Sequence, residues 1–170
     1  NSETQASTII DNANYDTVPL TSVFLKNSKE TIWALQPTGV QNAANTGAGR
    51  LLVLPSSGPS DTYFAYLNDD LVKSFDSSDL RLTSWINSVT ALGIKYNYAF
   101  KYKVGDVPSS TVEYPIIFRI AEQYLIRAEA RAQLNKLIGA ESAQSDLDKI
   151  RKRAGLIGTT ATSQEDLLAA

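Results

Sequence analysis

The sequence predicts a mainly α-helical protein with small β elements, in which a helical hairpin follows a loop-rich segment. Apolar residues recur at helical spacing in the C-terminal third, whereas the preceding part holds short alternating stretches between clusters of Gly, Pro, Ser and Asn. The change of character falls near Pro115. We therefore expect residues 1–114 to form a loop-rich segment with short strands and a short helix, and residues 115–170 to form the hairpin and the start of a third helix.

Composition and charge exclude several classes of protein. The chain has 170 residues, 43% of them hydrophobic, which suits one globular domain or a piece of a larger one. Its formal net charge of -2 offers no basic field to nucleic acid, and no apolar run reaches the roughly 18 residues of a membrane-spanning helix. His, Cys and Met are absent, which excludes His- and Cys-based nucleophilic catalysis, disulfides and the usual zinc ligands. We expect no cofactor and no metal site.

The first regular element along the chain is a short strand over residues 31–36, where side chains alternate between a more apolar and a less apolar face. We expect Trp33, on this strand, to be buried. Residues 37–59 are rich in Gly, Pro, Asn and Ser and predict a long loop region that is interrupted by the apolar run 51–54. We interpret Gly47-Ala-Gly49-Arg50 as a flexible part of this loop, because it lacks the third glycine of a dinucleotide-binding turn.

A short helix and a strand follow. Apolar residues after Asn68 predict the helix, and the turn-forming residues 76–79 end it. Aromatic side chains alternate with Lys, Asn and Ala from Tyr96 to Val104, which predicts a strand with an aromatic face. We favour a core position for these rings, with the lysines on the wet face. The alternative is that the rings stack on bases or sugars.

The segment after Pro115 predicts an antiparallel helical hairpin. Residues 117–132 carry an apolar stripe at helical spacing, with Pro115 in the first turn, where proline is tolerated. A second stripe runs over residues 140–154, and Gly155 follows at the position of a left-handed helix cap. Such a hairpin is the unit of tetratricopeptide-type arrays.

A third helix is predicted to begin at the end of the chain. Residues 162–166, Thr-Ser-Gln-Glu-Asp, have the pattern of a capping box, in which a hydroxyl and an acid satisfy free backbone donors. The chain ends at Ala170, before this helix buries an apolar face. We therefore expect the natural protein to continue, and a signal peptide or lipid anchor to lie before Asn1.

Charged residues offer few candidates for chemistry. Four carboxylates, Asp69, Asp70, Asp76 and Asp79, lie close in sequence, and a glycosidase needs two facing carboxylates. Acids at helix ends and in turns more often bind backbone donors, and we favour that interpretation. The basic run 151–153 could bind an anion, but its place in a last helical turn favours an interaction with the helix dipole.

Aromatic residues are the candidates for ligand binding. Tyr63 and Tyr66 border the loop rich in Gly, Pro and Ser, where an exposed ring is available to the apolar face of a sugar. Trp85 is the third candidate. We therefore predict Tyr63, Tyr66 and Trp85 as ligand-binding residues and no catalytic residue.

The hairpin carries a specific motif. Residues 119–130 read Arg-Ile-Ala-Glu-Gln-Tyr-Leu-Ile-Arg-Ala-Glu-Ala, and residues 151–156 read Arg-Lys-Arg-Ala-Gly-Leu. Together they resemble the C-terminal part of the SusD/RagB family of outer-membrane nutrient-binding lipoproteins. Residues 30–36 and 79–81 agree more loosely, so the resemblance covers about residues 28–170. The given sequence does not include the family's lipidated N-terminal Cys, its N-terminal half or the Glu- and Arg-rich segment that ordinarily follows the helix starting at Ser163.

The resemblance implies a mostly helical protein in which tetratricopeptide-like hairpins support a loop-rich, ligand-binding region. It implies a non-catalytic, lipid-anchored protein on the extracellular face of the outer membrane. Such a protein binds an oligosaccharide or polysaccharide and delivers it to a TonB-dependent transporter of the SusC type. Four hairpin residues would then form ion pairs within the scaffold: Arg119, Glu122, Arg127 and Glu129. The alternative is a helical scaffold or protein-interaction module that binds no glycan.

Overall fold

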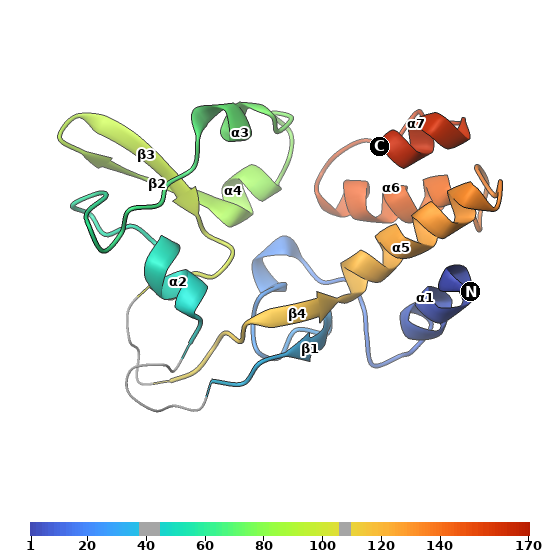
Figure 1. The fold of residues 1–170 in the computed structure, drawn as a ribbon, viewed down its shortest axis with the longest axis horizontal. Helices are drawn as coiled ribbons and strands as arrows, with labels where there is room; N and C mark the ends of the chain where they lie inside the picture. The colour runs from blue at the N-terminus through green and yellow to red at the C-terminus, as the bar shows by residue number, and fades with distance from the viewer. Residues whose placement is uncertain (38–44, 106–109) are drawn as a thin grey trace. The chain divides into compact units, whose positions relative to one another are not determined.

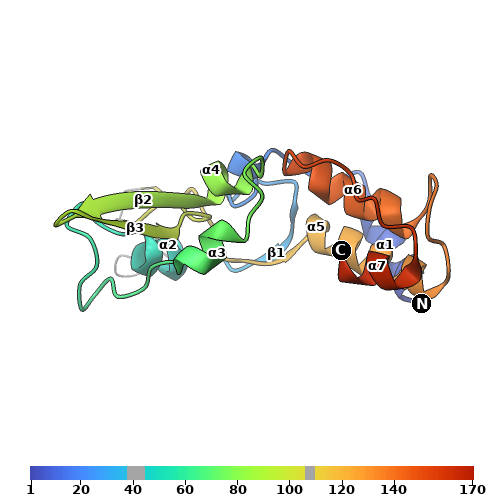
Figure 2. The same ribbon diagram turned by 90° about the horizontal axis from the view of Figure 1, so that it is seen from above.

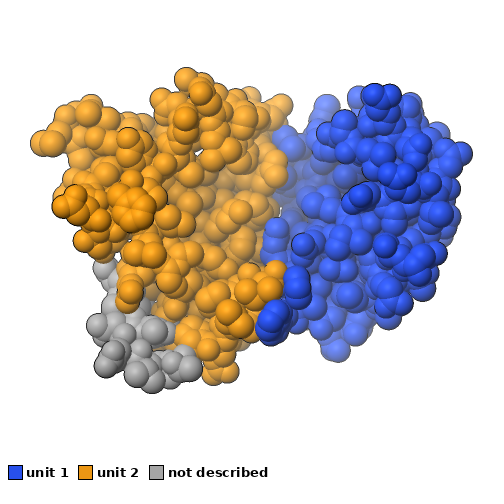
Figure 3. Space-filling model, viewed as in Figure 1, with its two compact units in different colours: residues 1–19, 29–33, 118–170 blue, residues 20–28, 34–117 orange. Residues whose placement is uncertain are grey.

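A computed structural model describes residues 1–37, 45–105 and 110–170. Across these ranges the chain forms seven α-helices, one 3-10 helix and four short strands, which confirms the predicted mainly α class with small β elements (Figure 1). The chain divides into two compact units (Figure 3). Unit 1 comprises residues 1–19, 29–33 and 118–170, and unit 2 comprises residues 20–28 and 34–117.

Unit 1 is built on the predicted helical hairpin, formed by α5 (Ile120–Gln133) and α6 (Ala143–Arg153). The helices α1 (Ser2–Ile10) and α7 (Gln164–Ala169) both pack against α5 (Figures 1 and 2). The core between α5, α6 and α7 consists mainly of small side chains, which let the helix backbones approach closely: Ala128, Ala132, Ala143, Leu147 and Leu167. Helix α1 was not predicted from the sequence.

The first helix of the hairpin begins three residues later than predicted. Residues Ile116–Arg119 form strand β4, which pairs with β1 (Thr31–Ala34) in a two-stranded sheet. The β-branched and aromatic side chains of β4 suit an extended backbone. At the junction, the Ile120 N–H donates to the Glu30 carbonyl oxygen at 2.8 Å. The position of Pro115 in a first helical turn was therefore wrong, because pairing with a distant strand overrides the helical pattern there.

The remaining helix ends of unit 1 follow local capping rules. The second helix begins at Ala143 rather than Ala140, because Ser142 and Ser145 form a reciprocal capping box. Gly155 has the predicted left-handed conformation, with φ of 78°. The hydroxyl of Ser163 accepts a hydrogen bond from the Asp166 N–H at 3.1 Å, which confirms the predicted start of the third helix.

A buried carboxylate joins α6 to α5. The Asp146 side chain, 3% exposed, accepts hydrogen bonds from the Arg127 guanidinium at 2.7 and 2.9 Å and from Arg131 at 2.9 Å. Arg131 also reaches Glu3 of α1 at 3.2 Å, and Lys136 contacts the same carboxylate at 2.8 Å. One connected set of ion pairs therefore links α1, α5 and α6.

A second buried carboxylate, Glu30, has no solvent-exposed surface and pairs with Arg119 at 3.0 Å and with Arg153 at the end of α6. The prediction that hairpin charges pair within the scaffold is thus confirmed for Arg119 and Arg127. Glu122 and Glu129 of α5 are exposed, and neither forms an ion pair with a residue that the structure describes. The ion pairs therefore connect α5 and the strand before it to distant segments rather than successive turns of α5 to one another.

Unit 2 consists of short elements. Its helices are η1 (Leu20–Ser22), α2 (Gly47–Leu52), α3 (Asp69–Lys73) and α4 (Arg81–Trp85). The strands β2 (Ile86–Ala91) and β3 (Ile94–Ala99) form an antiparallel hairpin whose register runs from Ile86↔Ala99 to Ala91↔Ile94 (Figure 2). The tight turn places Leu92 and Gly93 at φ of 51° and 78°. Such a pair of left-handed residues matches the twist of a two-residue hairpin loop.

The loop prediction for residues 37–59 was wrong at Gly47–Leu52, which form α2, and residues 38–44 lie outside the described ranges. The Thr46 hydroxyl caps α2 by accepting from the Gly49 N–H at 2.9 Å. A Cβ atom on Gly49 would lie 2.5 Å from the Val104 carbonyl oxygen. This glycine therefore permits close packing of the helix and is not a source of loop flexibility.

Two predictions about aromatic residues have different outcomes. Trp33 is 52% exposed rather than buried, and its ring lies 5.7 Å from that of Phe118 on the neighbouring strand. The error arises because a two-stranded sheet buries only what other elements cover. In the aromatic stripe, Tyr98 is in the core as predicted, and Tyr96 is half-buried. The strand itself ends at Ala99, earlier than predicted.

Candidate functional site

The three predicted ligand-binding residues all belong to unit 2. Tyr66 is 55% exposed and lies just before α3. Tyr63 is half-buried in a turn where its N–H donates to the Ser60 hydroxyl at 3.3 Å. Trp85 is the last residue of α4, and its indole N–H donates to the Leu20 carbonyl oxygen at 2.9 Å.

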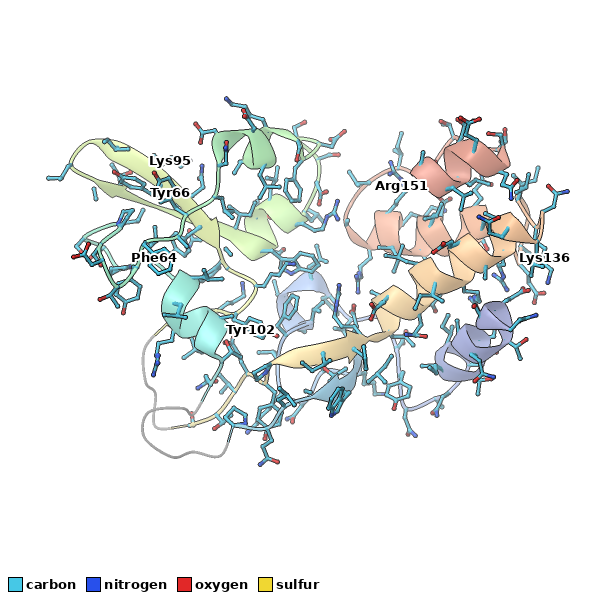
Figure 4. All side chains as sticks on the ribbon, in the orientation of Figure 1. Phe64, Tyr66, Lys95, Tyr102, Lys136 and Arg151 are labelled. Atoms are coloured by element: carbon cyan, nitrogen blue, oxygen red, sulfur yellow. The ribbon has the colours of Figure 1, made fainter. Side chains whose placement is uncertain are left out.

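Tyr66 borders a hollow of about 500 Å³, here called the Tyr66 hollow. Its walls are two runs of residues, Tyr66–Asp69 and Ile94–Asn97. The Leu67 N–H donates to the Asn97 carbonyl oxygen at 2.7 Å and so fixes the first run against β3. Figure 4 shows Tyr66 and Lys95 beside each other at the β2–β3 hairpin.

The Tyr66 hollow combines a supported aromatic ring with polar side chains. The ring of Tyr96 meets that of Tyr66 edge to face, with centroids 5.1 Å apart and planes at 76°. Two amides, Asn68 and Asn97, lie in the same walls, together with one ammonium group and one carboxylate. An aromatic face surrounded by both donors and acceptors can hold a flat, hydroxyl-rich molecule.

The sequence indicated some residues of the Tyr66 hollow and not others. Tyr66 was predicted from its place beside the loop, and Tyr96 belonged to the aromatic stripe, for which stacking was the alternative interpretation. Asn68, Lys95 and Asn97 were missed, because only the packing of the segment before α3 against β3 brings them together. No local spacing pattern in the sequence indicates that packing.

Trp85 borders a different hollow of about 420 Å³, here called the Trp85 hollow. Most of its wall is aliphatic or aromatic: Ala48, Leu52, Leu67, Leu71, Phe75, Trp85, Ile86, Ala99, Lys101 and Tyr102. Leu67 lies in the walls of both hollows. The structure therefore places Tyr66 and Trp85 in adjacent hollows, and Tyr63 in the wall of neither.

The acidic cluster supports the capping interpretation. Asp69 and Asp70 occupy the first turn of α3, and Asp76 accepts from the Ser78 N–H at 2.8 Å. Asp79 is buried, which tends to raise its pKa, but hydrogen bonds from Arg81 outweigh burial and lower the pKa. Within the described residues, no three His, Cys, Asp or Glu side chains gather where they could hold a metal ion.

The basic run at the end of α6 is also structural, as predicted. Arg151 donates to the Ile157 carbonyl oxygen at 3.1 Å, Lys152 pairs with Asp148 at 3.4 Å, and Arg153 pairs with Glu30. These cations lie in the last turn of the helix, where the helix dipole favours positive charge. Throughout the described ranges, every helix is too short or too polar to cross a lipid bilayer.

Solved structures share this fold over nearly the whole chain. Surface glycan-binding protein A from Bacteroides uniformis superposes with a TM-score of 0.73 at 19% identity, covering 98% of this chain and 40% of that protein. A SusD-like carbohydrate binding protein from Bacteroides vulgatus gives 0.73 at 22% identity, with 98% and 36% covered. Surface glycan-binding protein A from Bacteroides thetaiotaomicron, in complex with laminarihexaose, gives 0.66 at 19% identity, with 97% and 44% covered.

The chain thus spans about two fifths of the length of these solved proteins. Comparison with curated protein sequences gives no match. The SusD family matches residues 33–170, a range that contains the hairpin motif and nearly all of unit 2. Because this match covers most of the sequence and the fold agrees, the chain belongs to the SusD family.

Proposed function

We propose that this chain is part of a non-catalytic, cell-surface glycan-binding protein and that the Tyr66 hollow holds a sugar ring. The observation that carries the proposal is the exposed Tyr66 ring, which Tyr96 supports edge to face among amide side chains. Membership of the SusD family supports the proposal, as does the likeness to solved structures of surface glycan-binding proteins.

The geometry suits a pyranose ring. The axial C–H groups of such a ring form an apolar face that packs on an aromatic side chain, and Tyr66 supplies an exposed aromatic ring for this contact. Because Tyr96 already restricts the Tyr66 ring, little side-chain entropy is left to lose on binding. The amides of Asn68 and Asn97 each offer a donor and an acceptor to the sugar hydroxyls. No bond is made or broken in this role.

The other two predicted residues have secondary places in the proposal. Tyr63 lies three residues before Tyr66 and would contact a longer oligosaccharide that extends along the loop. Trp85 lies in the adjacent hollow, and its indole N–H is already bonded to Leu20. We therefore expect substitution of Trp85 to affect sugar binding less than substitution of Tyr66.

Family membership also suggests the setting of this function. We propose that the whole protein is lipid-anchored on the extracellular face of the outer membrane. There it would pass its oligosaccharide to a TonB-dependent transporter of the SusC type, and no nucleic acid or cofactor takes part.

Calorimetric titration with a panel of soluble glycans, including laminarihexaose, tests the proposal. We expect at least one glycan to bind with a millimolar to micromolar Kd, and Tyr66→Ala to weaken that binding by tenfold or more. Phe64→Ala is the matched control, because Phe64 lies in the same loop, is 75% exposed and is absent from the walls of the hollow (Figure 4). Equal losses in both variants, or no binding by any glycan, would contradict the proposal and favour a scaffold role.

A further inference from the structure

We propose that the turn at Gly58 positions the Tyr66 ring for the sugar, although Gly58 lies outside the walls of the Tyr66 hollow. This role rests on the proposed function, because it concerns what holds that site in shape. Gly58 packs against the β2–β3 hairpin beside Tyr96, and the ring of Tyr96 supports that of Tyr66. Gly58 and Tyr96 are therefore positioning residues, and Tyr66 is the residue that contacts the sugar.

Gly58 closes a tight turn that lies close against the hairpin. Its N–H donates to the Pro55 carbonyl oxygen at 2.9 Å, and its φ of 81° is in the left-handed region that favours glycine. A Cβ atom at this position would lie 2.6 Å from the Ala91 Cβ atom and 3.8 Å from two ring atoms of Tyr96. Because a residue with a Cβ atom would collide with Ala91, only glycine lets the turn approach the hairpin this closely.

The turn packs on the face of the hairpin that carries Tyr96. In the hairpin register Ala91 is opposite Ile94, and the side chains of such a pair lie on one face of the two strands. Ile94 and Tyr96 are two residues apart on β3, so they lie on that face as well. The contact of the turn with Ala91 therefore also places it behind the ring of Tyr96.

The loop that carries Tyr66 is fixed to the hairpin at two points. The first is the close packing of Gly58, and the second is the hydrogen bond from the Leu67 N–H to the Asn97 carbonyl oxygen at 2.7 Å. Tyr66 comes one residue before the second point, and its ring meets that of Tyr96 with centroids 5.1 Å apart. If the turn moved away, the Tyr96 ring would lose a neighbour on one side, and we expect the Tyr66 ring to lose its fixed position.

The test compares two left-handed glycines of unit 2. Gly58→Ala places a Cβ atom against Ala91, whereas Gly93→Ala, at φ of 78°, meets no atom within 4 Å. Both variants should lower the melting temperature, because alanine is strained in this conformation. Only Gly58→Ala should also weaken, by at least fivefold in calorimetry, the binding of laminarihexaose or of whichever glycan in the panel binds most tightly, because the sugar must then order a mobile Tyr66 ring. The Kd of Gly93→Ala should stay within twofold of wild type.

Further variants keep the test valid if Gly58→Ala alone does not fold. Ala91→Gly removes the Cβ atom that the new side chain would meet, so Gly58→Ala combined with Ala91→Gly should bind the glycan within twofold of Ala91→Gly alone. Tyr96→Phe keeps the supporting ring and should stay within twofold of the wild-type Kd. Tyr96→Leu removes the ring and should weaken glycan binding at least fivefold.

A measurement without glycan separates this role of Gly58 from the proposed function. Nuclear Overhauser contacts between the rings of Tyr66 and Tyr96 should be present in wild type and in Gly93→Ala, and weaker in Gly58→Ala. If no glycan bound the wild-type protein, the proposed function would fail, and the ring contacts would still test whether Gly58 positions Tyr66.

Four results would overturn the proposal. They are ring contacts in Gly58→Ala equal to those of wild type, a loss of glycan binding in Gly93→Ala as large as in Gly58→Ala, no recovery of binding with Ala91→Gly, and equal losses in Tyr96→Phe and Tyr96→Leu. Unchanged glycan binding by Gly58→Ala, in a protein that loses binding on Tyr66→Ala, would overturn the role of Gly58 and leave the proposed function standing.

Discussion

Unit 1 and unit 2 differ in how far along the chain their buried ion pairs reach. In unit 1, the buried carboxylates of Asp146 and Glu30 are each held by two arginines, so these charges are paired inside the protein. In unit 2, the buried carboxylate of Asp79 pairs with its near neighbour Arg81, and aromatic rings line two hollows. Buried ion pairs between distant segments thus connect the helices of unit 1, whereas unit 2 holds the aromatic residues that we propose to bind ligand.

The lengths of the helices give the physical reason. The helices α5 and α6 have 14 and 11 residues, whereas α2, α3 and α4 have six, five and five. Helices below roughly 12–15 residues are marginal in isolation, so the short helices of unit 2 depend on their neighbours. In unit 1, small side chains instead let the long helices α5 and α6 pack closely against each other.

The largest expected loss of stability comes from removing the buried ion pairs of unit 1. Replacing Asp146 by Ala leaves the Arg127 and Arg131 guanidinium groups mostly buried without their shared carboxylate. We expect this change to lower the free energy of unfolding by about 3–5 kcal/mol, as measured by urea denaturation. Glu129→Ala, an exposed change on α5, is the control and should stay within about 0.5 kcal/mol of wild type. If the two variants lost equal free energy of unfolding, the pairing of Asp146 with Arg127 and Arg131 would not stabilise unit 1.

Close packing within unit 2 gives the next largest effect. Gly49→Ala places a Cβ atom 2.5 Å from the Val104 carbonyl oxygen, and we expect a loss of about 1–3 kcal/mol in the free energy of unfolding. Gly47→Ala in the same helix meets no atom within 4 Å. This control should be neutral or stabilising by up to about 1 kcal/mol, since Ala favours a helix over Gly. A loss in the control as large as in Gly49→Ala would rule out the steric cause.

A third variant separates ligand binding from stability. Tyr66→Ala should remove most glycan binding while changing the free energy of unfolding by about 1 kcal/mol or less, because the ring is more than half exposed. Denaturation and calorimetry on the same preparation measure both effects. A large loss of stability would show that Tyr66 belongs to the core of unit 2 rather than to a ligand surface.

The smallest effect concerns pH. The hydrogen bond from Lys136 lowers the pKa of Glu3 below its usual 4.5, although burial of the carboxyl opposes this. The ionised pair therefore adds stability above pH 4.5, and this contribution is lost as pH falls through the lower pKa of the folded state.

Lys136→Met tests this contribution. The side chain of Lys136 is 52% exposed (Figure 4). Removing its charge should therefore lower the free energy of unfolding by about 1 kcal/mol or less at neutral pH, and by less in acid. Melting temperatures at several pH values measure the difference. If the difference in melting temperature between the variant and wild type grew as pH fell, the Glu3–Lys136 pair would not be the source of this stability.

Prediction from the sequence succeeded where one segment contains all of the information. The stripes of α5 and α6, the left-handed Gly155 and the Ser163 cap depend only on near neighbours. It failed at β4 and at Trp33, because strand pairing and burial depend on segments that are distant in the sequence.

The amino-acid sequence by itself determined the helical hairpin, the caps at Gly155 and Ser163 and the family motif, and it made Tyr66 a candidate for ligand binding. Only the tertiary structure decided that Asp146 and Glu30 hold the scaffold together, and that Asn68, Lys95 and Asn97 lie beside Tyr66. The physical reason is that periodicity and capping act over a few residues. Buried ion pairs and hollows instead form only when side chains from distant segments come into contact. No short stretch of sequence specifies which distant residues it will contact.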